Sequence, residues 1–269
     1  MIKSVIHLAD IHLRTYRYHD EYNEVFENLY REIQNVLETY DYEDTRIVIV
    51  GDIFHQKITI SNESLLMCSK FFRRLAEIAP LVIVAGNHDL LENNQDRLDS
   101  ITPVVGLLDN DNIQYLKGSE CYEDNNIVWC NYSVFEGCRR PDIDTARMTY
   151  GSDKKYIGLY HAPLIGAKTD VGYKFESGTP LDVFDGCDAV LCGDIHMRQI
   201  ITSDIPVVMP GSLIQQDFGE SVNNHGFLVW DVETLTFEAI DIENPYKFYT
   251  FEVNGIDDID NDLEILKNN

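Results

Sequence analysis

The chain contains the stretch Ile47-Val48-Ile49-Val50-Gly51-Asp52-Ile53-Phe54-His55, in which an apolar run passes directly into a glycine, a carboxylate and then a histidine. A short β-branched run that ends at a glycine is typical of a strand buried on both faces of a parallel sheet. Ligands of open α/β sheets bind at the carboxyl ends of such strands. The stretch therefore predicts an α/β fold and places Asp52 at the edge where a site would form.

Four more apolar runs end in the same kind of polar motif. The runs 5–9, 81–85, 156–160 and 189–192 lead into Asp10-Ile11-His12, Gly86-Asn87-His88-Asp89, His161 and Gly193-Asp194-Ile195-His196. Each run predicts a buried strand. We therefore expect the five strand ends to gather their carboxylates, imidazoles and amide at one edge of one sheet.

Amphipathic segments separate the first three predicted strands. Apolar residues recur at helical spacing over 22–37 and again over 65–78, where Ser61 or Asn62 is the predicted N-cap of the second helix. This β-α-β-α-β order predicts a parallel sheet with right-handed crossovers.

The second half of the chain has a different pattern. Residues 127–132 predict a further strand, and the polar segment 137–152 predicts a loop. Beyond His196, the predicted strands 206–209, 226–232 and 236–242 follow one another without helices. This pattern predicts antiparallel additions, and thus a second sheet packed on the first.

The composition limits the classes of function. With 269 residues, of which 44% are hydrophobic, the chain predicts one globular domain or one domain with a small appendage. No apolar run reaches the length of a membrane span, and the apolar N-terminus predicts a first strand rather than a secretory signal. The six cysteines form no CxxC pair, so we expect free thiols in a reducing, cytoplasmic setting. A net charge of −25 argues against a broad nucleic-acid-binding face, although a local basic patch remains open.

The polar groups at the strand ends are suitable ligands for divalent cations. Asp10 and His12 lie two residues apart, so on an extended chain they point the same way and can bind one ion. Asp52 can bridge two ions through its two carboxylate oxygens. Mixed oxygen and imidazole ligation without thiolate favours Mn²⁺, Fe²⁺ or Zn²⁺ in a reactive site over a purely structural zinc. The predicted metal ligands are Asp10, His12, Asp52, Asn87, His161, Asp194 and His196.

Two adjacent ions are the usual arrangement for in-line displacement at phosphorus, with a water between them as the nucleophile. His88 and His55 lie beside the predicted ligands in the sequence, and either can donate a proton to the leaving oxygen. Asp89 can hold the His88 ring in one tautomer. These three residues are the predicted catalytic residues.

As an ordered set, the five motifs resemble the signature of the calcineurin-like metallophosphoesterases, and the resemblance spans residues 10–196. The extended second motif through His55 resembles the SbcD-type exonucleases of DNA double-strand-break repair, as do Pro210-Gly211-Ser212-Leu213 and Asp217-Phe218-Gly219-Glu220. The resemblance implies an α/β fold, a four-layer αββα sandwich of two mixed β-sheets flanked by helices. It also implies a nuclease domain over 1–244 and a C-terminal extension or linker over 245–269, with the cap domain of the family absent or truncated.

The resemblance further implies a role for each motif residue. One ion would be held by Asp10, His12, Asp52 and His196, and the other by Asp52, Asn87, His161 and Asp194. His88 would donate the proton or stabilise the transition state, and His55 would assist at the phosphate. SbcD-type enzymes hydrolyse DNA with Mn²⁺ as 3′-to-5′ exonucleases and endonucleases, usually as homodimers bound to an SbcC-type ATPase.

One position departs from the family pattern, and two other functions stay open. The family usually has histidine where this chain has Asp194, and a carboxylate there predicts a preference for Mn²⁺ or Mg²⁺ over Zn²⁺. The net charge of −25 favours a phosphomonoesterase or cyclic-nucleotide phosphodiesterase, which needs no basic groove. A non-catalytic scaffold is disfavoured, because every ligand position holds a metal-competent residue. The acidic tail from Asp257 predicts a mobile end or a linker.

Overall fold

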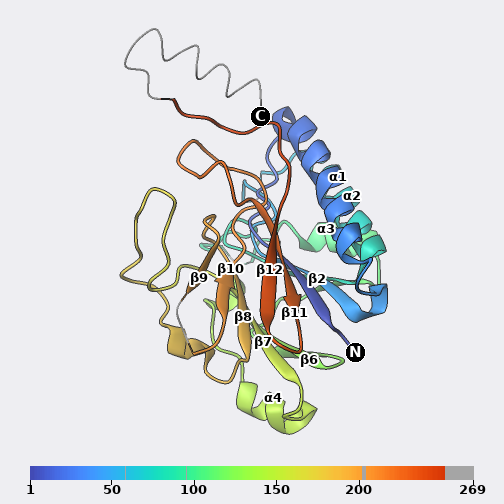
Figure 1. Cartoon of the computed structure of the whole chain (residues 1–269), viewed down its shortest axis with the longest axis vertical. Helices are drawn as coiled ribbons and strands as arrows, with labels where there is room; N and C mark the ends of the chain where they lie inside the picture. The colour runs from blue at the N-terminus through green and yellow to red at the C-terminus, as the bar shows by residue number, and fades with distance from the viewer. Residues whose placement is uncertain (58, 95, 202–203, 252–269) are drawn as a thin grey trace.

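The computed structural model describes residues 1–57, 59–94, 96–201 and 204–251. These residues form two mixed β-sheets of six strands each, with helices on their outer faces (Figure 1). The predicted acidic tail from Asp257 lies outside the described residues.

The first sheet contains the strands that end in the first three motifs. Its order is β12-β11-β1-β2-β3-β4. The strands are β1 (Ser4–Leu8), β2 (Thr45–Val50), β3 (Leu81–Val84), β4 (Ile113–Tyr115), β11 (Gly226–Asp231) and β12 (Thr236–Asp241). Strands β1 to β4 are parallel to one another, whereas β11 pairs antiparallel with both β1 and β12.

The second sheet contains the strands that end in the last two motifs. Its order is β5-β6-β7-β8-β10-β9. The strands are β5 (Cys121–Asp124), β6 (Ile127–Tyr132), β7 (Lys155–His161), β8 (Ala189–Gly193), β9 (Gln199–Ile201) and β10 (Val207–Met209). The central strands β6, β7, β8 and β10 run parallel, and the two edge strands are antiparallel to their neighbours.

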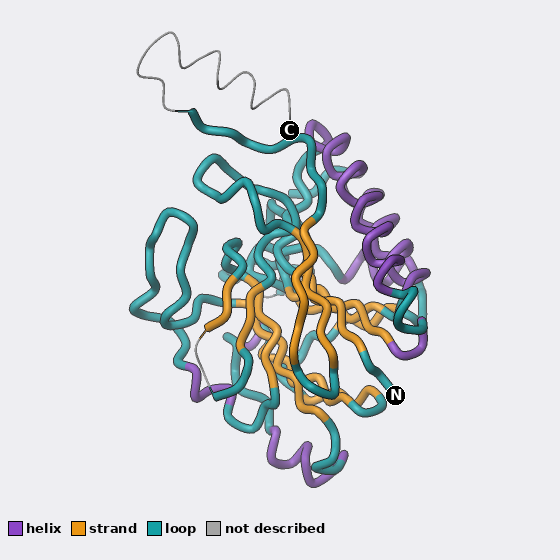
Figure 2. The backbone as a smooth tube through the Cα atoms, in the orientation of Figure 1, coloured by secondary structure: helices purple, strands orange, loops and turns teal. Residues whose placement is uncertain are grey.

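The helices lie outside the two sheets. Figure 2 shows the two long helices (purple) along one side of the strands (orange). The α-helices are α1 (His19–Val36), α2 (Asn62–Ile78), α3 (Thr102–Leu108) and α4 (Ile143–Tyr150), and short 3-10 helices span Tyr16–Tyr18, Tyr42–Asp44, Val134–Glu136 and Leu181–Phe184. Ser61 is the N-cap of α2, where its side chain accepts a hydrogen bond from the Ser64 N–H.

Alternation along the buried strands explains the four layers. In β2, Ile47 and Ile49 pack with α1 and α2, whereas Val48 and Val50 pack against the second sheet. In β6, Trp129 points to the space between the sheets and Val128 packs in the outer cluster with α4. Since both faces of these strands are covered, apolar residues occupy consecutive positions, from Ile47 to Val50 in β2 and from Ile127 to Cys130 in β6. The predicted αββα sandwich is therefore confirmed.

Three sequence predictions about the layout were wrong. The five motif strands divide between two sheets, because a buried run does not reveal which neighbour it pairs with. Of the strands predicted beyond His196, β10 lies in the second sheet but runs parallel to β8, whereas β11 and β12 are antiparallel additions, as predicted, that extend the first sheet instead. The segment predicted as a loop contains α4, whose N-cap Asp142 accepts a hydrogen bond from the Thr145 N–H.

Candidate metal centre

The candidate ligands lie on turns that follow the strand ends. The backbone φ is +52° at Asp10, +48° at His12, +52° at Asp52 and +86° at Asp194, a left-handed region that costs roughly 1–2 kcal/mol for a non-glycine residue. Hydrogen bonds between turns hold this geometry. The Asp10 N–H donates to the Gly51 carbonyl at 3.1 Å, the His12 N–H to the Asp52 carbonyl at 2.9 Å, and the Asp194 N–H to the Asp10 carboxylate at 3.1 and 3.2 Å. The two sheets are therefore joined at the site.

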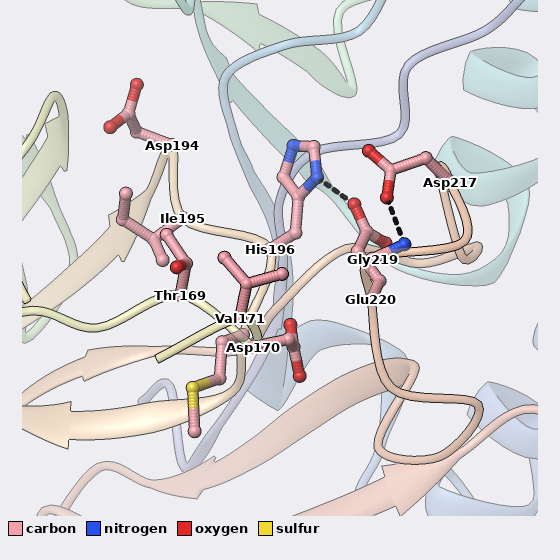
Figure 3. Close-up of a pocket in the computed structure, with 10 residues that line it drawn as sticks. Thr169, Asp170, Val171, Asp194, Ile195, His196, Asp217, Gly219 and Glu220 are labelled. Atoms are coloured by element: carbon pink, nitrogen blue, oxygen red, sulfur yellow. Dashed lines mark hydrogen bonds and ion pairs between the residues drawn. The ribbon is translucent and has the colours of Figure 1, made fainter. Parts of the chain in front are cut away.

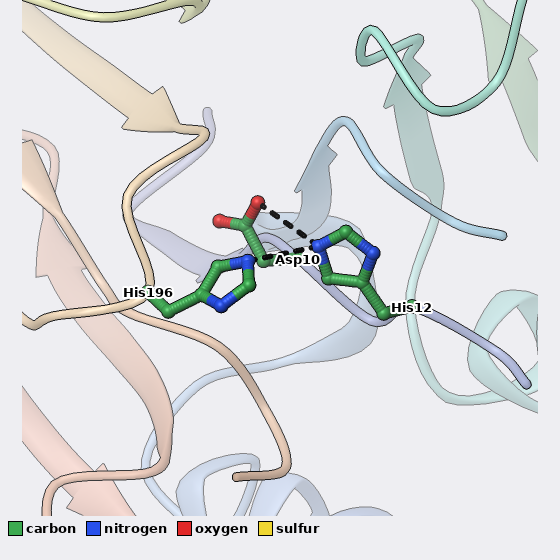
Figure 4. Close-up of side chains that lie close together, drawn as sticks. All are labelled: Asp10, His12 and His196. Atoms are coloured by element: carbon green, nitrogen blue, oxygen red, sulfur yellow. Dashed lines mark hydrogen bonds and ion pairs between the residues drawn. The ribbon is translucent and has the colours of Figure 1, made fainter. Parts of the chain in front are cut away.

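These turns bring imidazole nitrogens and carboxylate oxygens together. In three groups the ligand atoms lie within 4.8 Å of one another: Asp10, His12 and His196; His12, Asp52 and His88; and Asp10, Asp52 and His161. Figure 4 shows the first group, in which His12 Nε2 lies 2.9 Å from His196 Nε2 and 3.9 Å from an Asp10 oxygen. Because the groups share members, they form one continuous cluster with the mixed donor set that fits divalent cations.

The amide Asn87 joins the same cluster. Its Oδ1 lies 3.3 Å from His161 Nε2, which is 3.2 Å from Asp52 Oδ1. Asp52 thus stands between His161 on one side and His12 on the other, where its second oxygen lies 3.4 Å from His12 Nε2. This central place is the one that a bridging carboxylate between two ions would require.

Hydrogen bonds outside the cluster orient two of the candidate ligand rings. His161 Nδ1 lies 2.8 Å from the Val50 carbonyl, and His196 Nδ1 lies 2.5 Å from a Glu220 carboxylate oxygen. In each ring the Nδ1 proton is engaged, so Nε2 is left to face the cluster. Such partners fix the tautomer and raise the basicity of a metal-binding imidazole.

Close approach at Gly51 and Gly86 explains why these positions lack side chains. A Cβ on Gly51, where φ is +79°, would lie 2.6 Å from His161 Cγ and 2.8 Å from Gly86 Cα. A Cβ on Gly86 would lie 2.6 Å from His161 Nε2. The two glycines therefore leave room for the His161 ring against the strand-end turns.

The pKa values in the cluster are shifted by burial, and in some groups the charges of neighbouring residues oppose that shift. Burial raises the pKa of Asp10 to about 7 and raises the pKa of Asp194. Burial acts in the same direction on Asp52, but the adjacent His161 and His12 hold the pKa of that carboxyl below its usual range. Burial lowers the pKa of His12 far below that of a free imidazole.

Carboxylates reverse the effect of burial at the other two histidines. Burial lowers the pKa of His161, but the charge of Asp52 and its contact with the ring raise it well above the ordinary value. At His196, burial is likewise outweighed by the hydrogen bond to Glu220, and the pKa rises to about 9. Excess negative charge in the cluster thus stabilises cations.

The predicted catalytic histidines lie against the same cluster. The His88 ring centroid is 5.0 Å from that of His12, and the His55 ring centroid is 5.5 Å from it. His88 Nδ1 lies 2.7 Å from the His55 carbonyl, so the proton on this nitrogen is held and Nε2 is the nitrogen free toward the cluster. Burial lowers the pKa of His55 to about 4.

The role predicted for Asp89 was wrong. Its carboxylate accepts hydrogen bonds from the N–H groups of Ile53, Phe54 and Gly86, at 2.9 to 3.2 Å, rather than orienting the His88 ring. The His55 carbonyl orients that ring instead. Asp89 is fully buried, so it fixes the turn after β2 against the turn after β3 and positions the residues that both turns carry.

Asp194 differs from the other six predicted ligands. Its carboxylate belongs to none of the three compact groups, and Figure 3 shows it directed away from the ring of His196. Its backbone N–H donates to the Asp10 carboxylate, and its own carboxylate interacts with His161 and His196 through charge. Metal ligation by Asp194 stays a prediction.

Sequence reasoning gave no role to Glu220, which connects the cluster to a nearby cation. One Glu220 oxygen contacts His196, and the other accepts a hydrogen bond from the Gln216 N–H at 2.7 Å. Gln216 in turn accepts hydrogen bonds from Arg14 at its side-chain and main-chain oxygens. The available signal was the stretch Asp217-Phe218-Gly219-Glu220, which carries part of the family resemblance.

Comparison with known proteins agrees with this geometry. The sequence profile of the family described as calcineurin-like phosphoesterase matches residues 3–198. The chain belongs to this family. Calcineurin-like phosphoesterases are hydrolases of phosphoester bonds that typically bind two divalent metals, and the Asp and His cluster supplies candidate ligands for them.

One relative extends the comparison almost to the whole chain. This calcineurin-like phosphoesterase is 37% identical over 262 residues to the uncharacterized protein R555 of Acanthamoeba polyphaga mimivirus. The aligned part covers 94% of this chain and 19% of the viral protein, so the chain spans about a fifth of the length of that relative. Within the described part of the chain, no helix combines the length and the apolar composition needed to cross a lipid bilayer.

Proposed function

We propose that the chain is a metal-dependent phosphodiesterase that degrades DNA from its 3′ end, with Mn²⁺ as the preferred metal. The observation that carries the proposal is the position of His88, with one nitrogen held by the His55 carbonyl and the ring against His12 and Asp52. Two divalent cations would be held by Asp10, His12, Asp52, Asn87, His161 and His196. When bound, they would neutralise charge at the phosphate oxygens and lower the pKa of a water for in-line attack. His88 Nε2 then gives a proton to the departing sugar oxygen.

The charges around the cluster favour a diester over a monoester. A phosphomonoester carries a charge between about −1.5 and −2 at neutral pH, whereas a diester carries one negative charge. The neighbouring guanidinium, Arg14, donates two hydrogen bonds to Gln216, and His55 is neutral at pH 7 because burial lowers its pKa to about 4. Arg14 keeps its single charge, because glutamine does not neutralise it, and it is the fixed cation that acts on His55 beside the cluster. One such charge in addition to the metals suits a singly charged substrate.

Two features support DNA as the substrate. The segment Asp217 to Glu220 resembles SbcD-type exonucleases, and it supports the metal centre through the contact between Glu220 and His196. Phe218 in the same segment is 65% exposed, and its ring centroid lies 4.9 Å from that of Phe248, so it packs against the chain while keeping a face for a base. By the same resemblance we propose action as a homodimer with an SbcC-type ATPase.

A small phosphoester is the alternative substrate. The net charge of −25 favours it, and basic residues that could form a patch are paired with acids. Arg139 Nη2 lies 2.5 Å from Glu136, and Lys154 contacts Glu123. A non-catalytic scaffold is disfavoured, because six of the seven predicted ligands converge.

The test is hydrolysis of three substrates by purified protein with Mn²⁺: labelled linear DNA, bis-p-nitrophenyl phosphate and p-nitrophenyl phosphate. The proposal expects release of mononucleotides and faster cleavage of the bis ester than of the monoester. Asp52→Ala, which removes the central carboxylate, is the inactive control. Cleavage of the monoester alone would establish the alternative. Asp194→His tests the metal preference, since a shift from Mn²⁺ toward Zn²⁺ is expected if Asp194 is a ligand.

A further inference from the structure

A pocket of about 280 Å³ lies beside the candidate metal centre. The turn after β8, from Asp194 to Met197, forms one wall and contributes His196 to both the pocket and the cluster. Figure 3 shows the other residues around the His196 ring, with Thr169, Asp170 and Val171 from one loop and Asp217, Gly219 and Glu220 from another. A molecule in the pocket would therefore adjoin any phosphate held at the centre.

The outer wall belongs to a long loop between β7 and the 3-10 helix Leu181–Phe184. Figure 1 shows this loop in yellow, projecting from the body of the protein. Its two arms are tied by bridges between Leu164 and Thr179 and between Lys168 and Lys174. Two apolar side chains near its tip are open to solvent, Val171 at 75% and Tyr173 at 58% exposure. The loop is a defined projection with an apolar end, and it closes one side of the pocket.

The chemistry of the lining selects a class of ligand. Val171, Ile195 and Met197 offer apolar surface. Apart from the candidate ligand His196, the ionisable groups are carboxylates, with Asp170 and Asp217 on opposite sides. Among the residues that the structure describes, no lysine or arginine lines the pocket. Carboxylates accept hydrogen bonds from amino and hydroxyl groups and repel phosphate. The fitting ligand is therefore uncharged, partly apolar and rich in donors, as is a nucleoside.

We propose that this pocket binds the terminal nucleoside of the DNA strand being cut, and that Asp170 and Asp217 admit a free 3′-hydroxyl end but exclude an end that carries a 3′-phosphate. The inference rests on the proposed function and adds a selectivity to it. The pocket volume is at the lower limit of small-molecule pockets, so it can hold one nucleoside. The enzyme would then release one nucleotide in each cut.

The experiment compares two oligonucleotides that are identical except for a 3′-hydroxyl or a 3′-phosphate, with a 5′ fluorophore and Mn²⁺. We expect the hydroxyl end to be shortened at least about tenfold faster, because a terminal phosphate adds up to two charges beside fixed carboxylates. The variant Asp170→Asn/Asp217→Asn keeps shape and acceptor oxygens, including the one that binds the Gly219 N–H. It should reduce the ratio to below about threefold.

The matched control is Asp144→Asn/Asp153→Asn, which removes the same charge from exposed positions outside the pocket. It should keep both the wild-type ratio and the wild-type rate on bis-p-nitrophenyl phosphate. The pocket variant is judged by its own ratio of rates on the two ends, which does not depend on its overall rate. Equal rates on both ends in the wild type, or an unchanged ratio in the pocket variant, would overturn the inference while leaving the nuclease intact. Hydrolysis of the bis ester without cleavage of either oligonucleotide would overturn the proposed DNA substrate and the subsite together.

Discussion

Gly51 allows a sharp test of the site, because it adjoins a candidate ligand without being one. It directly follows β2 with a φ of +79°, and the His161 ring occupies the space where its Cβ would stand. In Gly51→Ala, the new Cβ would lie 2.6 Å from His161 Cγ, whereas ordinary contacts begin at 3.4 Å. The ring must therefore retreat by about 1 Å, since the backbone of Gly86 blocks the Cβ on another side.

Two separate costs follow from this geometry. The left-handed backbone costs an alanine roughly 1–2 kcal/mol of folding free energy. The displacement moves His161 Nε2 out of contact with Asp52 and Asn87. A misplacement of about 1 Å in a catalytic site lowers the rate by roughly 10²-fold. We expect Gly51→Ala to remain folded, to bind less metal and to lose at least that factor in kcat/KM.

The control separates strain from displacement. Gly137 has a φ of +64° and open space where its Cβ would stand, so Gly137→Ala carries the backbone cost alone. Denaturant unfolding, elemental analysis of bound metal and hydrolysis of bis-p-nitrophenyl phosphate are measured on both variants. Similar stability losses with activity lost only in Gly51→Ala support the account. Full activity and full metal content in Gly51→Ala would refute the placement of His161.

Three more predictions test single parts of the structure. His88→Asn should lower turnover by roughly 10²- to 10⁴-fold while metal content by elemental analysis is retained, and loss of both together would contradict its role as proton donor. Arg46 in β2 pairs with Asp124 in β5 at 2.8 and 2.9 Å, and the two side chains are 10% and 9% exposed. Arg46→Ala should lower the free energy of unfolding in urea by about 3–5 kcal/mol. A loss below 1 kcal/mol would argue against this pair between the sheets. Burial lowers the pKa of His7 to about 3, below its unfolded value of 6.5. The buried ring therefore stays neutral while the unfolded chain binds a proton below pH 6.5, so the free energy of unfolding falls by about 2 kcal/mol between pH 6.5 and pH 5. In His7→Phe this part of the acid sensitivity should vanish from the stability profile, and an unchanged profile would exclude His7 as its source.

Local pattern predicted the elements that depend on local rules. The strand predicted over 127–132 is β6 with the same bounds, and the predicted cap Ser61 begins α2. The missed helix α4 is short, and its polar sequence resembles a loop, although Asp142 three residues before Thr145 is a capping signal. Assignment of strands to sheets failed because β2 and β8 are both buried runs, and nothing in either run indicates which strands it pairs with.

The candidate site was predictable as a set of residues and not as a geometry. The motifs named the residues that converge, because each motif stands at the end of a strand. The contacts that orient them join positions far apart in the chain, such as the Asp194 N–H with Asp10 and the His196 ring with Glu220. The local sequence pattern does not predict such long-range contacts. For that reason Asp89 was predicted to orient the ring of its sequence neighbour His88.

The left-handed turns lead to a last prediction about the protein without metal. The four candidate ligand residues with positive φ persist only where surrounding contacts determine their conformation, and the backbone hydrogen bonds from Asp10, His12 and Asp194 are such contacts. The ligand turns are thus built by the fold itself. Protein treated with a chelator should keep its circular dichroism spectrum and a cooperative melt, and saturating Mn²⁺ should raise its stability by about 2.7 kcal/mol at a hundredfold excess over Kd. Unfolding on chelation would show instead that the metal, and not the turns, holds the two sheets together at this edge.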